Sequence, residues 1–291
     1  NMTLNEVYLE GKSILKSAKI ESFSFDTMKI FEFCFNFGRQ DIILFRNTVA
    51  DSKKALKFFE LINQRANGKP LQYILGHWNF MDCKFKVGEG VLIPRDDTEV
   101  LVNKVFSLIN NINRPKILDL CAGSGTISIS LAKKRKDADI VAVELSEIAL
   151  KYLKMNINLN KVKNVIPIQI DVLSATAGLN FEKFDIIVSN PPYIPTEDLY
   201  SLQKEVLHEP KMALDGGDDG LKFYRAIVKN WVRFLKKSGC ICVEIGINQS
   251  NEVVDIFKHA NFKNIQTIKD LSGINRVVVA KKFLIFFFFQ K

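Results

Sequence analysis

The chain has 291 residues, of which 47% are hydrophobic, and a net charge of +9. This length favours two domains, and the apolar content is ample for a hydrophobic core. Because no apolar run approaches the ~20 residues that span a bilayer, we expect no membrane partner. The positive charge attracts polyanions in general, but the lysines are dispersed without interleaved aromatic residues, so we expect no stable nucleic-acid binding.

The cysteines and the first residues bear on cellular location. The five cysteines lack the paired spacing of a metal site, and Cys240 and Cys242 lie in a predicted strand. The first residues show no basic segment followed by an apolar core. We therefore expect reduced thiols, no metal ion and a cytoplasmic monomer.

The first 66 residues show the apolar spacing of helices. Apolar side chains recur three and four residues apart, as at Leu4, Val7, Leu15 and Leu61. Residues 1–66 are therefore predicted to form a small helical domain.

A linker is predicted at residues 67–93. Gly68-Lys69-Pro70 ends the last helix of the first domain, and residues 78–87 alternate in polarity as a hairpin does. The second domain is expected at residues 94–282. The phenylalanine-rich residues 283–291 form a tail, for which an added edge strand, a surface-packed segment and an aggregation-prone segment all remain open.

Strands and helices alternate in the second domain. The predicted strands are residues 116–121, 139–144, 165–170, 184–189 and 240–245. The predicted helices are residues 149–159, 221–235 and 253–260, with another that begins near Ile127. This alternation is typical of a parallel sheet with helices on both faces.

The first of these strands runs into a glycine turn. Ala122-Gly123-Ser124-Gly125 separates the strand from a helix, so the backbone can approach a ligand closely and the helix N-terminus supplies N–H donors. A dinucleotide-binding loop would have a third glycine at position 128, where Ser128 stands. The sequence therefore weakens the hypothesis of a nicotinamide cofactor.

Acidic residues stand at the ends of three strands. Asp119 lies near the end of the first, Glu144 ends the second and Asp171 follows the third. Each alone is equally consistent with a helix cap or a loop charge. Because ligands of open α/β sheets bind at the C-terminal edge, we expect Glu144 to bind a ribose and Asp171 to accept a hydrogen bond from an adenine amino group.

The fourth strand ends in Asn190-Pro191-Pro192-Tyr193. The side-chain carbonyl of Asn190 and the backbone carbonyl of Pro191 offer two acceptors to one NH2 group, and the prolines fix the second acceptor. Tyr193 can then lie against a planar group. A bare Pro-Pro pair would more simply end a strand, but here a glycine turn and strand-end acids accompany it. An amide or exocyclic amine is a poor nucleophile, so we expect catalysis by positioning.

These motifs resemble the S-adenosylmethionine-dependent methyltransferases that modify amide or exocyclic amino nitrogens. Further segments narrow the resemblance to the HemK/PrmC family, which methylates the glutamine of the Gly-Gly-Gln motif in peptide-chain release factors. The segments that carry it are Arg65 to Gly76, Leu92 to Glu99, Glu205 to Tyr224 and Asp270 to Val277. The resemblance therefore extends from about residue 60 to residue 282.

The resemblance implies a Rossmann-like class I methyltransferase domain with a mostly parallel seven-stranded sheet, and S-adenosylmethionine as cofactor, with S-adenosylhomocysteine as product. The implied cofactor-binding residues are Asp119, Cys121, Ala122, Gly123, Ser124, Gly125, Glu144, Leu145, Asp171, Val172 and Asn190. The implied substrate-binding residues are Asn190, Pro191, Pro192 and Tyr193, of which Asn190, Pro191 and Tyr193 are the catalytic residues. Asp119 would support either the methionine end of the cofactor or the glycine turn.

Three departures and two alternatives accompany this interpretation. Cys121 stands where the family often has glycine, and Val172 stands where some members have an aromatic residue, which predicts weaker packing on the adenine. The phenylalanine-rich run at residues 283–289 is not part of the family's pattern. A DNA or RNA adenine amino-methyltransferase would have the same catalytic loop, residues 190–193, but it must flip a base and usually carries a recognition domain. The helical domain of residues 1–66, without a basic aromatic face, suits the docking of a protein substrate better. A catalytically silent binding module of the same fold is the other alternative, against which the intact Asn190 and the intact acids argue.

Overall fold

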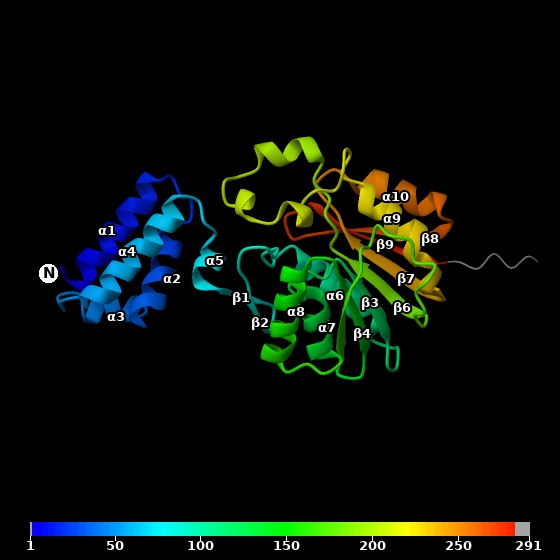
Figure 1. Cartoon of the computed structure of the whole chain (residues 1–291), viewed down its shortest axis with the longest axis horizontal. Helices are drawn as coiled ribbons and strands as arrows, with labels where there is room; N and C mark the ends of the chain where they lie inside the picture. The colour runs from blue at the N-terminus through cyan, green and yellow to red at the C-terminus, as the bar shows by residue number, and fades with distance from the viewer. Residues whose placement is uncertain (1, 283–291) are drawn as a thin grey trace, which may run out of the picture. The chain divides into compact units, whose positions relative to one another are not determined.

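The computed structural model of the chain describes residues 2–282, which form two compact units (Figure 1). One unit contains residues 2–77 together with Gln203–His208, and the other contains Trp78–Leu202 and residues 209–282. The return of Gln203–His208 to the first unit has no signal in the sequence. The predicted domain bounds at residues 66 and 94 stay a prediction, and the predicted tail lies outside the described residues.

The first unit is a small helical bundle. Its helices are α1 (Leu4–Ser17), α2 (Phe23–Phe35), α3 (Arg39–Leu44), α4 (Ser52–Ala66) and α5 (Leu71–Leu75). The apolar faces of α1, α2 and α4 meet at the fully buried side chains of Val7, Phe31 and Phe58. The rings of Phe31 and Phe58 pack edge to face with 5.6 Å between their centroids, which is an arrangement that aromatic pairs prefer.

A buried ion pair connects two of these helices. The Nε of Arg65 in α4 donates to the carboxylate of Asp26 in α2 at 2.7 Å, and both side chains are almost fully buried. Burial raises the pKa of Asp26, and the neighbouring guanidinium opposes that rise. Arg65 also pairs with Glu205. The second pair explains why Gln203–His208 belongs to the first unit, because a buried guanidinium needs its full set of acceptors.

Asp26→Ala should lower the free energy of unfolding by about 3 kcal/mol, because it leaves the buried guanidinium of Arg65 short of an acceptor. Lys29→Ala is the matched control on the same helix, since it breaks the more exposed pair with Glu32 and should cost less than about 0.5 kcal/mol. Denaturant unfolding of the full chain measures both. Equal, small losses would contradict a stabilising role for the buried pair.

The second unit is built on a seven-stranded sheet. Its strands are β3 (Lys116–Leu120), β4 (Asp139–Glu144), β5 (Val165–Gln169), β6 (Phe184–Ser189), β7 (Leu235–Glu244), β8 (Phe262–Lys269) and β9 (Asn275–Lys282). They lie in the order β5-β4-β3-β6-β7-β9-β8, and the first five in this order are parallel. β9 pairs antiparallel with both β7 and β8. The predicted mostly parallel seven-stranded sheet is confirmed.

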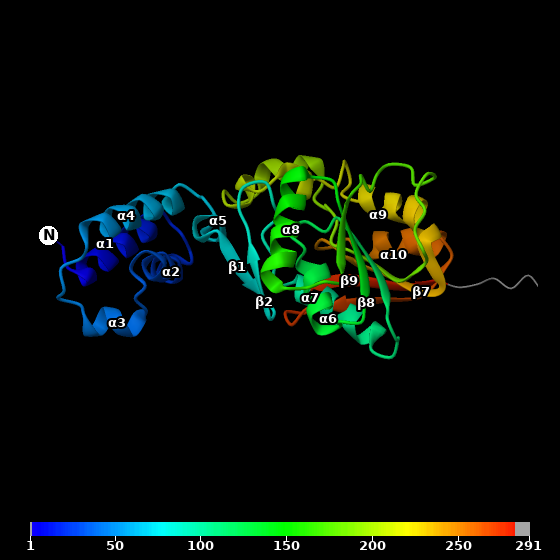
Figure 2. The same cartoon turned by 60° about the horizontal axis from the view of Figure 1, so that its bottom comes forward.

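Helices cover both faces of this sheet. On one face lie α6 (Thr98–Ile109), α7 (Thr126–Lys134) and α8 (Glu147–Asn160), and on the other lie α9 (Lys222–Ala226) and α10 (Ser250–His259), as the two views show (Figures 1 and 2). α6 was not among the predicted helices, although its buried residues follow helical spacing. Among residues 2–282, no helix is both long enough and apolar enough to cross a membrane.

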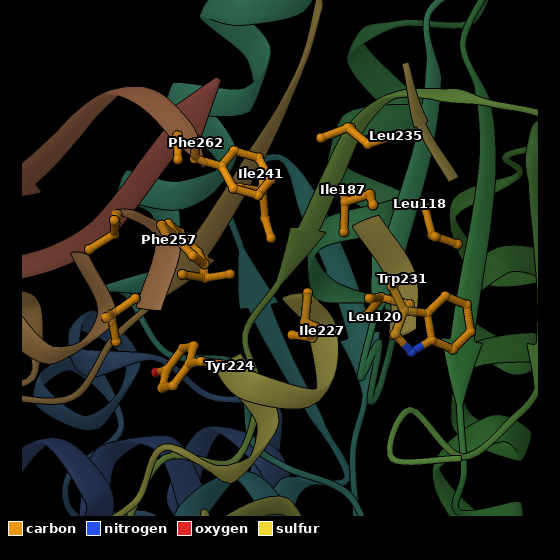
Figure 3. Packing of buried hydrophobic residues seen from close by; sticks show 14 of the residues in the cluster. Leu118, Leu120, Ile187, Tyr224, Ile227, Trp231, Leu235, Ile241, Phe257 and Phe262 are labelled. Carbon is orange, nitrogen blue, oxygen red and sulfur yellow. The ribbon is translucent and has the colours of Figure 1, made fainter. Parts of the chain in front are cut away.

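An extensive apolar cluster lies between the sheet and the helices α9 and α10 (Figure 3). Leu118, Ile187 and Ile241 come from three neighbouring strands, and all three are fully buried. Two large side chains of the cluster also have polar tips. Trp231 Nε1 donates to the carbonyl of Val172 at 2.9 Å, and the Tyr224 hydroxyl donates to the carbonyl of Glu244 at 2.8 Å. The core therefore holds the loop after β5 and the end of β7 in place.

The segment between residues 221 and 245 differs from the prediction of one helix and a short strand. α9 is followed by a π-helical turn over Ile227–Trp231 and a 3-10 turn over Val232–Phe234. β7 begins at Leu235, earlier than the predicted Cys240. The side chains of Ile227, Trp231 and Phe234 are all buried. Their packing against the sheet therefore outweighs regular helical hydrogen bonding here.

A two-stranded sheet lies within the predicted linker. Its strands are β1 (His77–Phe80) and β2 (Cys83–Lys86). The side-chain amide of Asn156 in α8 binds both backbone groups of Lys86 in β2. Its Oδ1 accepts from the N–H of Lys86 at 2.6 Å, and its Nδ2 donates to the carbonyl of Lys86 at 3.1 Å. The same Nδ2 donates to the carbonyl of Ser124 at 3.0 Å. Asn156 thus connects β2 to the glycine turn.

Candidate active site

A cavity of about 920 Å³ opens at the C-terminal edge of the parallel strands. Its walls come from the loops that follow β3, β4, β5 and β6, from residues 90–92 and from residues 210–225, all within the second unit. The predicted site residues that line it are Cys121, Gly123, Glu144, Leu145, Asp171, Val172, Asn190 and Pro192. Parallel strands end at one edge, and this brings residues from four loops to one ligand-sized space.

The glycine turn adopts left-handed backbone conformations. Cys121, Gly123 and Gly125 have φ angles of 62°, 56° and 90°. A Cβ on Gly123 would meet no atom within 4 Å, whereas a Cβ on Gly125 would approach the side chain of Leu153 to 2.5 Å. Gly123 therefore leaves room for a ligand, and Gly125 permits close packing under the turn. Cys121 adopts this conformation without being glycine, which costs about 1–2 kcal/mol of backbone strain.

Asp119 lies beneath the turn and is not part of the cavity wall. Its side chain is fully buried, and Oδ2 accepts hydrogen bonds from the backbone N–H of Ser128, at 3.2 Å, and from the Ser128 hydroxyl. Burial raises the pKa of Asp119 to about 7. Of its two predicted roles, these contacts favour support of the turn, because they tie β3 to α7. They also account for serine at position 128, where a dinucleotide-binding loop would have glycine.

Glu144 is oriented by two backbone donors. Its Oε2 accepts from the N–H of Gly123 and its Oε1 from the N–H of Ser146, both at 2.8 Å. Burial raises the pKa of this carboxyl, and the two N–H groups oppose the rise. Each carboxylate oxygen retains a second acceptor position. Glu144 is thus fixed in orientation and can still accept hydrogen bonds from two neighbouring hydroxyl groups.

The loop after β5 supplies a polar and an apolar side chain. Asp171 is half-buried at the cavity, and its Oδ1 accepts from the N–H of Leu173 at 2.9 Å. Val172 is buried, and Trp231 holds its carbonyl from behind. Leu145, which follows β4, is 43% exposed and gives a second apolar contact surface. This side of the cavity can therefore hold a flat apolar group with a polar edge.

Asn190 follows β6 and lines the cavity. Its Nδ2 donates to the hydroxyl Oγ1 of Thr98, the first residue of α6, at 3.3 Å. The NH2 half of the amide is therefore engaged by the protein. Its Oδ1 is then the atom that can accept a hydrogen bond from a ligand.

Pro191 and Tyr193 do not line the cavity. Tyr193, at the end of the predicted catalytic loop (residues 190–193), and the next residue, Ile194, are fixed by contacts with other segments. The carbonyl of Tyr193 accepts from Gln249 Nε2 at 2.8 Å, and Ile194 exchanges backbone hydrogen bonds with Leu214 and Gly216 at 2.9 and 2.8 Å. A Cβ on Gly216 would lie 2.7 Å from the Cα of Tyr193. Glycine at 216 thus permits the loop to pack directly on Tyr193. Stacking of Tyr193 on the substrate stays a prediction.

Gly216→Ala should reduce turnover by about ten- to a hundredfold, since its Cβ would displace backbone atoms of Tyr193 and misplace the catalytic loop by a few tenths of an ångström to 1 Å. Gly178→Ala is the control, because a Cβ there meets nothing within 4 Å. Initial rates and thermal melting of both variants test this. Equal rates for the two variants would show that the close packing at Gly216 does not matter.

Several residues of the cavity wall were missed in the sequence. Leu92, Thr196, Met212, Asp215 and Phe223 line the cavity but had no predicted role. Leu92 lies within one of the segments that carry the family resemblance, and Met212, Asp215 and Phe223 lie between residues of another, whereas Thr196 follows Asn190-Pro191-Pro192-Tyr193 by three residues. The family-like segments were recognised in the sequence, but a single sequence does not indicate that their side chains line a cavity.

A buried carboxylate joins the two wall segments that do not follow a parallel strand, residues 90–92 and residues 210–225. Glu209 accepts from the N–H of Ile93 at 2.9 Å and pairs with Arg95, and its own side chain is 1% exposed. This fixes the segment that contains Leu92 against the segment that contains Pro210.

The predicted cofactor residues Ala122, Ser124 and Gly125 are buried under the turn and, like Asp119, do not line the cavity. Their direct contact with a cofactor stays a prediction.

Comparison with known proteins places the chain in a family. The model of the PrmC N-terminal domain matches residues 6–76, and that of the methyltransferase small domain matches residues 96–230. A release factor glutamine methyltransferase of Clostridium acetobutylicum is 35% identical over 96% of this chain and 98% of its own length. The chain belongs to the release factor glutamine methyltransferase family. It is therefore a methyltransferase.

A further member of the family and one solved structure are also similar to the chain. The release factor glutamine methyltransferase of Thermodesulfovibrio yellowstonii is 41% identical over 81% of this chain and 85% of its own length. The catalytic domain of hMettl16, solved in complex with MAT2A 3'UTR hairpin 6, has a TM-score of 0.57 at 12% identity, over 81% of this chain and 84% of that one. At this identity the likeness concerns the fold alone.

Proposed function

We propose that this protein transfers a methyl group from S-adenosylmethionine to the side-chain amide nitrogen of the glutamine in the Gly-Gly-Gln motif of peptide-chain release factors. The orientation of Asn190 carries the proposal, because the bond to Thr98 uses its NH2 and keeps Oδ1 as the acceptor at the cavity. A glutamine amide presents a flat NH2 that such an acceptor can bind. The names of the curated relatives support a release factor glutamine as substrate.

The residues at the cavity fit S-adenosylmethionine. The oriented carboxylate of Glu144 can accept from the two ribose hydroxyls, and Asp171 can accept from the adenine amino group. Leu145 and Val172 offer apolar surface to the adenine ring, and Gly123 leaves space beside the backbone. The cofactor, when bound, supplies an electrophilic methyl group on a sulfonium, and S-adenosylhomocysteine is the product.

The side chains of the catalytic loop position the acceptor nitrogen. The Oδ1 of Asn190 accepts one N–H group of the substrate amide at the cavity, where Pro192 also lies. Pro191 and Tyr193 do not line the cavity, so the second hydrogen bond, to the Pro191 carbonyl, and the packing of Tyr193 on the amide plane stay predictions. These bonds direct the weak nitrogen nucleophile and raise its electron density. A carbon–nitrogen bond forms as the carbon–sulfur bond breaks. The methylated amide is strongly acidic at that moment and releases a proton to water, so no side chain is required as a base.

Two further features suit a protein substrate, and the enzyme is expected to act as a monomer. A release factor as substrate implies action in the cytoplasm, without a membrane partner. The basic residues are dispersed along the sequence, which disfavours a stable complex with nucleic acid.

Transfer of a labelled methyl group tests the proposed function directly. The acceptors are a purified release factor, the same factor with its Gly-Gly-Gln glutamine changed to alanine, and duplex DNA. Label on the unchanged factor alone is the expected result. Label on DNA would overturn the proposal in favour of an adenine amino-methyltransferase, and no label on any acceptor, with cofactor bound, would overturn the release factor as substrate.

Asn190→Ala should bind cofactor with an affinity within about threefold of the unchanged enzyme and lose about a hundredfold or more in turnover, because one preorganised acceptor is removed. Calorimetric titration with cofactor and initial rates at saturating cofactor measure the two effects. Unchanged turnover would rule out the assigned role of Asn190.

Glu144→Ala should show the opposite pattern, with cofactor affinity reduced by about ten- to a hundredfold and turnover at saturating cofactor within a fewfold of the unchanged enzyme. Glu147→Ala, an exposed acid in the first turn of α8, is the matched control and should change neither quantity. A large loss of turnover at saturating cofactor would contradict a role confined to the ribose.

A further inference from the structure

A buried carboxylate lies directly behind the catalytic loop. Glu244 is the last residue of β7, and its side chain is almost fully buried. β6 and β7 are parallel, with Ser189 paired with Val243. The register therefore brings Glu244 level with Asn190, the residue after Ser189, on the neighbouring strand end. A carboxylate in this position is costly to bury, and the proposed transfer has not yet used it.

A chain of hydrogen bonds runs from Asn190 to this carboxylate. The Nδ2 of Asn190 donates to Thr98 Oγ1 at 3.3 Å, and Thr98 Oγ1 donates to Glu244 Oε2 at 2.7 Å. The threonine hydroxyl has a single proton. When that proton is directed to Glu244, the hydroxyl can only accept from Asn190. The amide must then turn its NH2 towards Thr98 and its Oδ1 away from it.

The direction of this chain depends on Glu244 being an acceptor only. An ionised carboxylate has no proton to give, so the hydroxyl proton of Thr98 points to it. A protonated or amide side chain at 244 could donate to Thr98 instead. The hydroxyl proton would then be free to point at Asn190, where it would pair with Oδ1. In that arrangement the Oδ1 of Asn190 bonds to Thr98 and no longer faces the substrate. The NH2 of Asn190 then faces the NH2 of the substrate amide, and neither group can accept a hydrogen bond from the other.

The surroundings hold Glu244 without neutralising it by a direct ion pair. The charge of Arg276 in β9 acts on Glu244, but its guanidinium pairs with Asp97 at 3.0 Å and with Asp270 at 2.8 Å. Within residues 2–282 no ion pair to Glu244 is found. The Tyr193 hydroxyl reaches Oε1 at 3.5 Å, and the Tyr224 hydroxyl donates to the backbone carbonyl of Glu244. The carboxylate therefore relies on hydroxyl donors for its hydrogen bonds.

We propose that Glu244 and Thr98 are positioning residues that orient the amide of Asn190, so that Oδ1 rather than Nδ2 faces the acceptor nitrogen of the substrate. This inference rests on the proposed function for its link to turnover. The geometry that carries it does not depend on the identity of the substrate. Neither residue touches the substrate, and both act through Asn190.

The orientation should depend on pH. Burial raises the pKa of Glu244 to about 7, and nearby Asp97 adds to the rise, while the hydrogen bond from Thr98, the charge of Arg276 and the Tyr193 hydroxyl oppose it. The carboxylate is ionised above this pKa. Turnover should therefore rise as the pH increases from about 6 to 8, and the orienting chain should reverse at the lower pH.

Three variants test the proposal through turnover on a release factor. Thr98→Val removes the bridging hydroxyl and should lower kcat by about ten- to a hundredfold, with cofactor affinity within about twofold. Thr98→Ser restores the hydroxyl and should recover most of the rate. Glu244→Gln should lower kcat at pH 8 and abolish the rise near pH 7. Equal rates for Thr98→Ser and Thr98→Val, or an unchanged pH profile in Glu244→Gln, would overturn it.

A second measurement needs no substrate, so it separates this inference from the proposed function. The side-chain NH2 of Asn190 gives a pair of nitrogen–proton NMR signals, which Asn190→Ala identifies by their loss. These signals should shift with a midpoint near pH 7 in the full chain and stay constant in Glu244→Gln. Signals that do not respond to pH in the unchanged protein would overturn the orienting chain. A normal response with no release-factor methylation would instead reject only the proposed function.

Discussion

The site depends on one constraint, the common polarity of five adjacent strands. Because β5, β4, β3, β6 and β7 are parallel, their carboxyl ends meet at one edge, and each loop that leaves this edge starts at a fixed spacing from the next. Asp171, Glu144, Asn190 and Glu244 are far apart in the sequence, yet the sheet order places them at the ends of β5, β4, β6 and β7, with the glycine turn after β3 between Glu144 and Asn190. The pairing of the strands therefore determines which residues meet at the site, before their side chains make any contact.

A weak nucleophile explains why so much of this edge is rigid. An amide nitrogen has a delocalised lone pair, so the enzyme gains little from a strong base and much from correct placement. The observed contacts serve placement at several levels. Gln249 and Gly216 fix the backbone of the catalytic loop, Glu209 joins the wall segments, and Ser128 anchors the turn through Asp119.

Much of the fold could be predicted from the sequence, and the limits have physical causes. Strand ends such as Glu144 and Asn190 follow continuous apolar runs, so their positions in the sheet were predictable. The roles of Thr98 and Glu244 were not, because each depends on a partner more than 50 residues away along the chain, and local patterns carry no information on such pairs. The π-helical turn at Ile227–Trp231 was missed because packing against the sheet, rather than propensity, decides it.

The segment Gln203–His208 has a consequence for how the protein evolves. The chain passes between the two units three times, after His77, after Leu202 and after His208, and Glu205 brings a carboxylate to the buried Arg65. A single crossover near residue 77 would exchange the helical unit without its returning segment, and the guanidinium would then face a foreign partner. A designed chimera therefore takes both partners of this ion pair from one parent only when residues 203–208 are exchanged together with the helical unit.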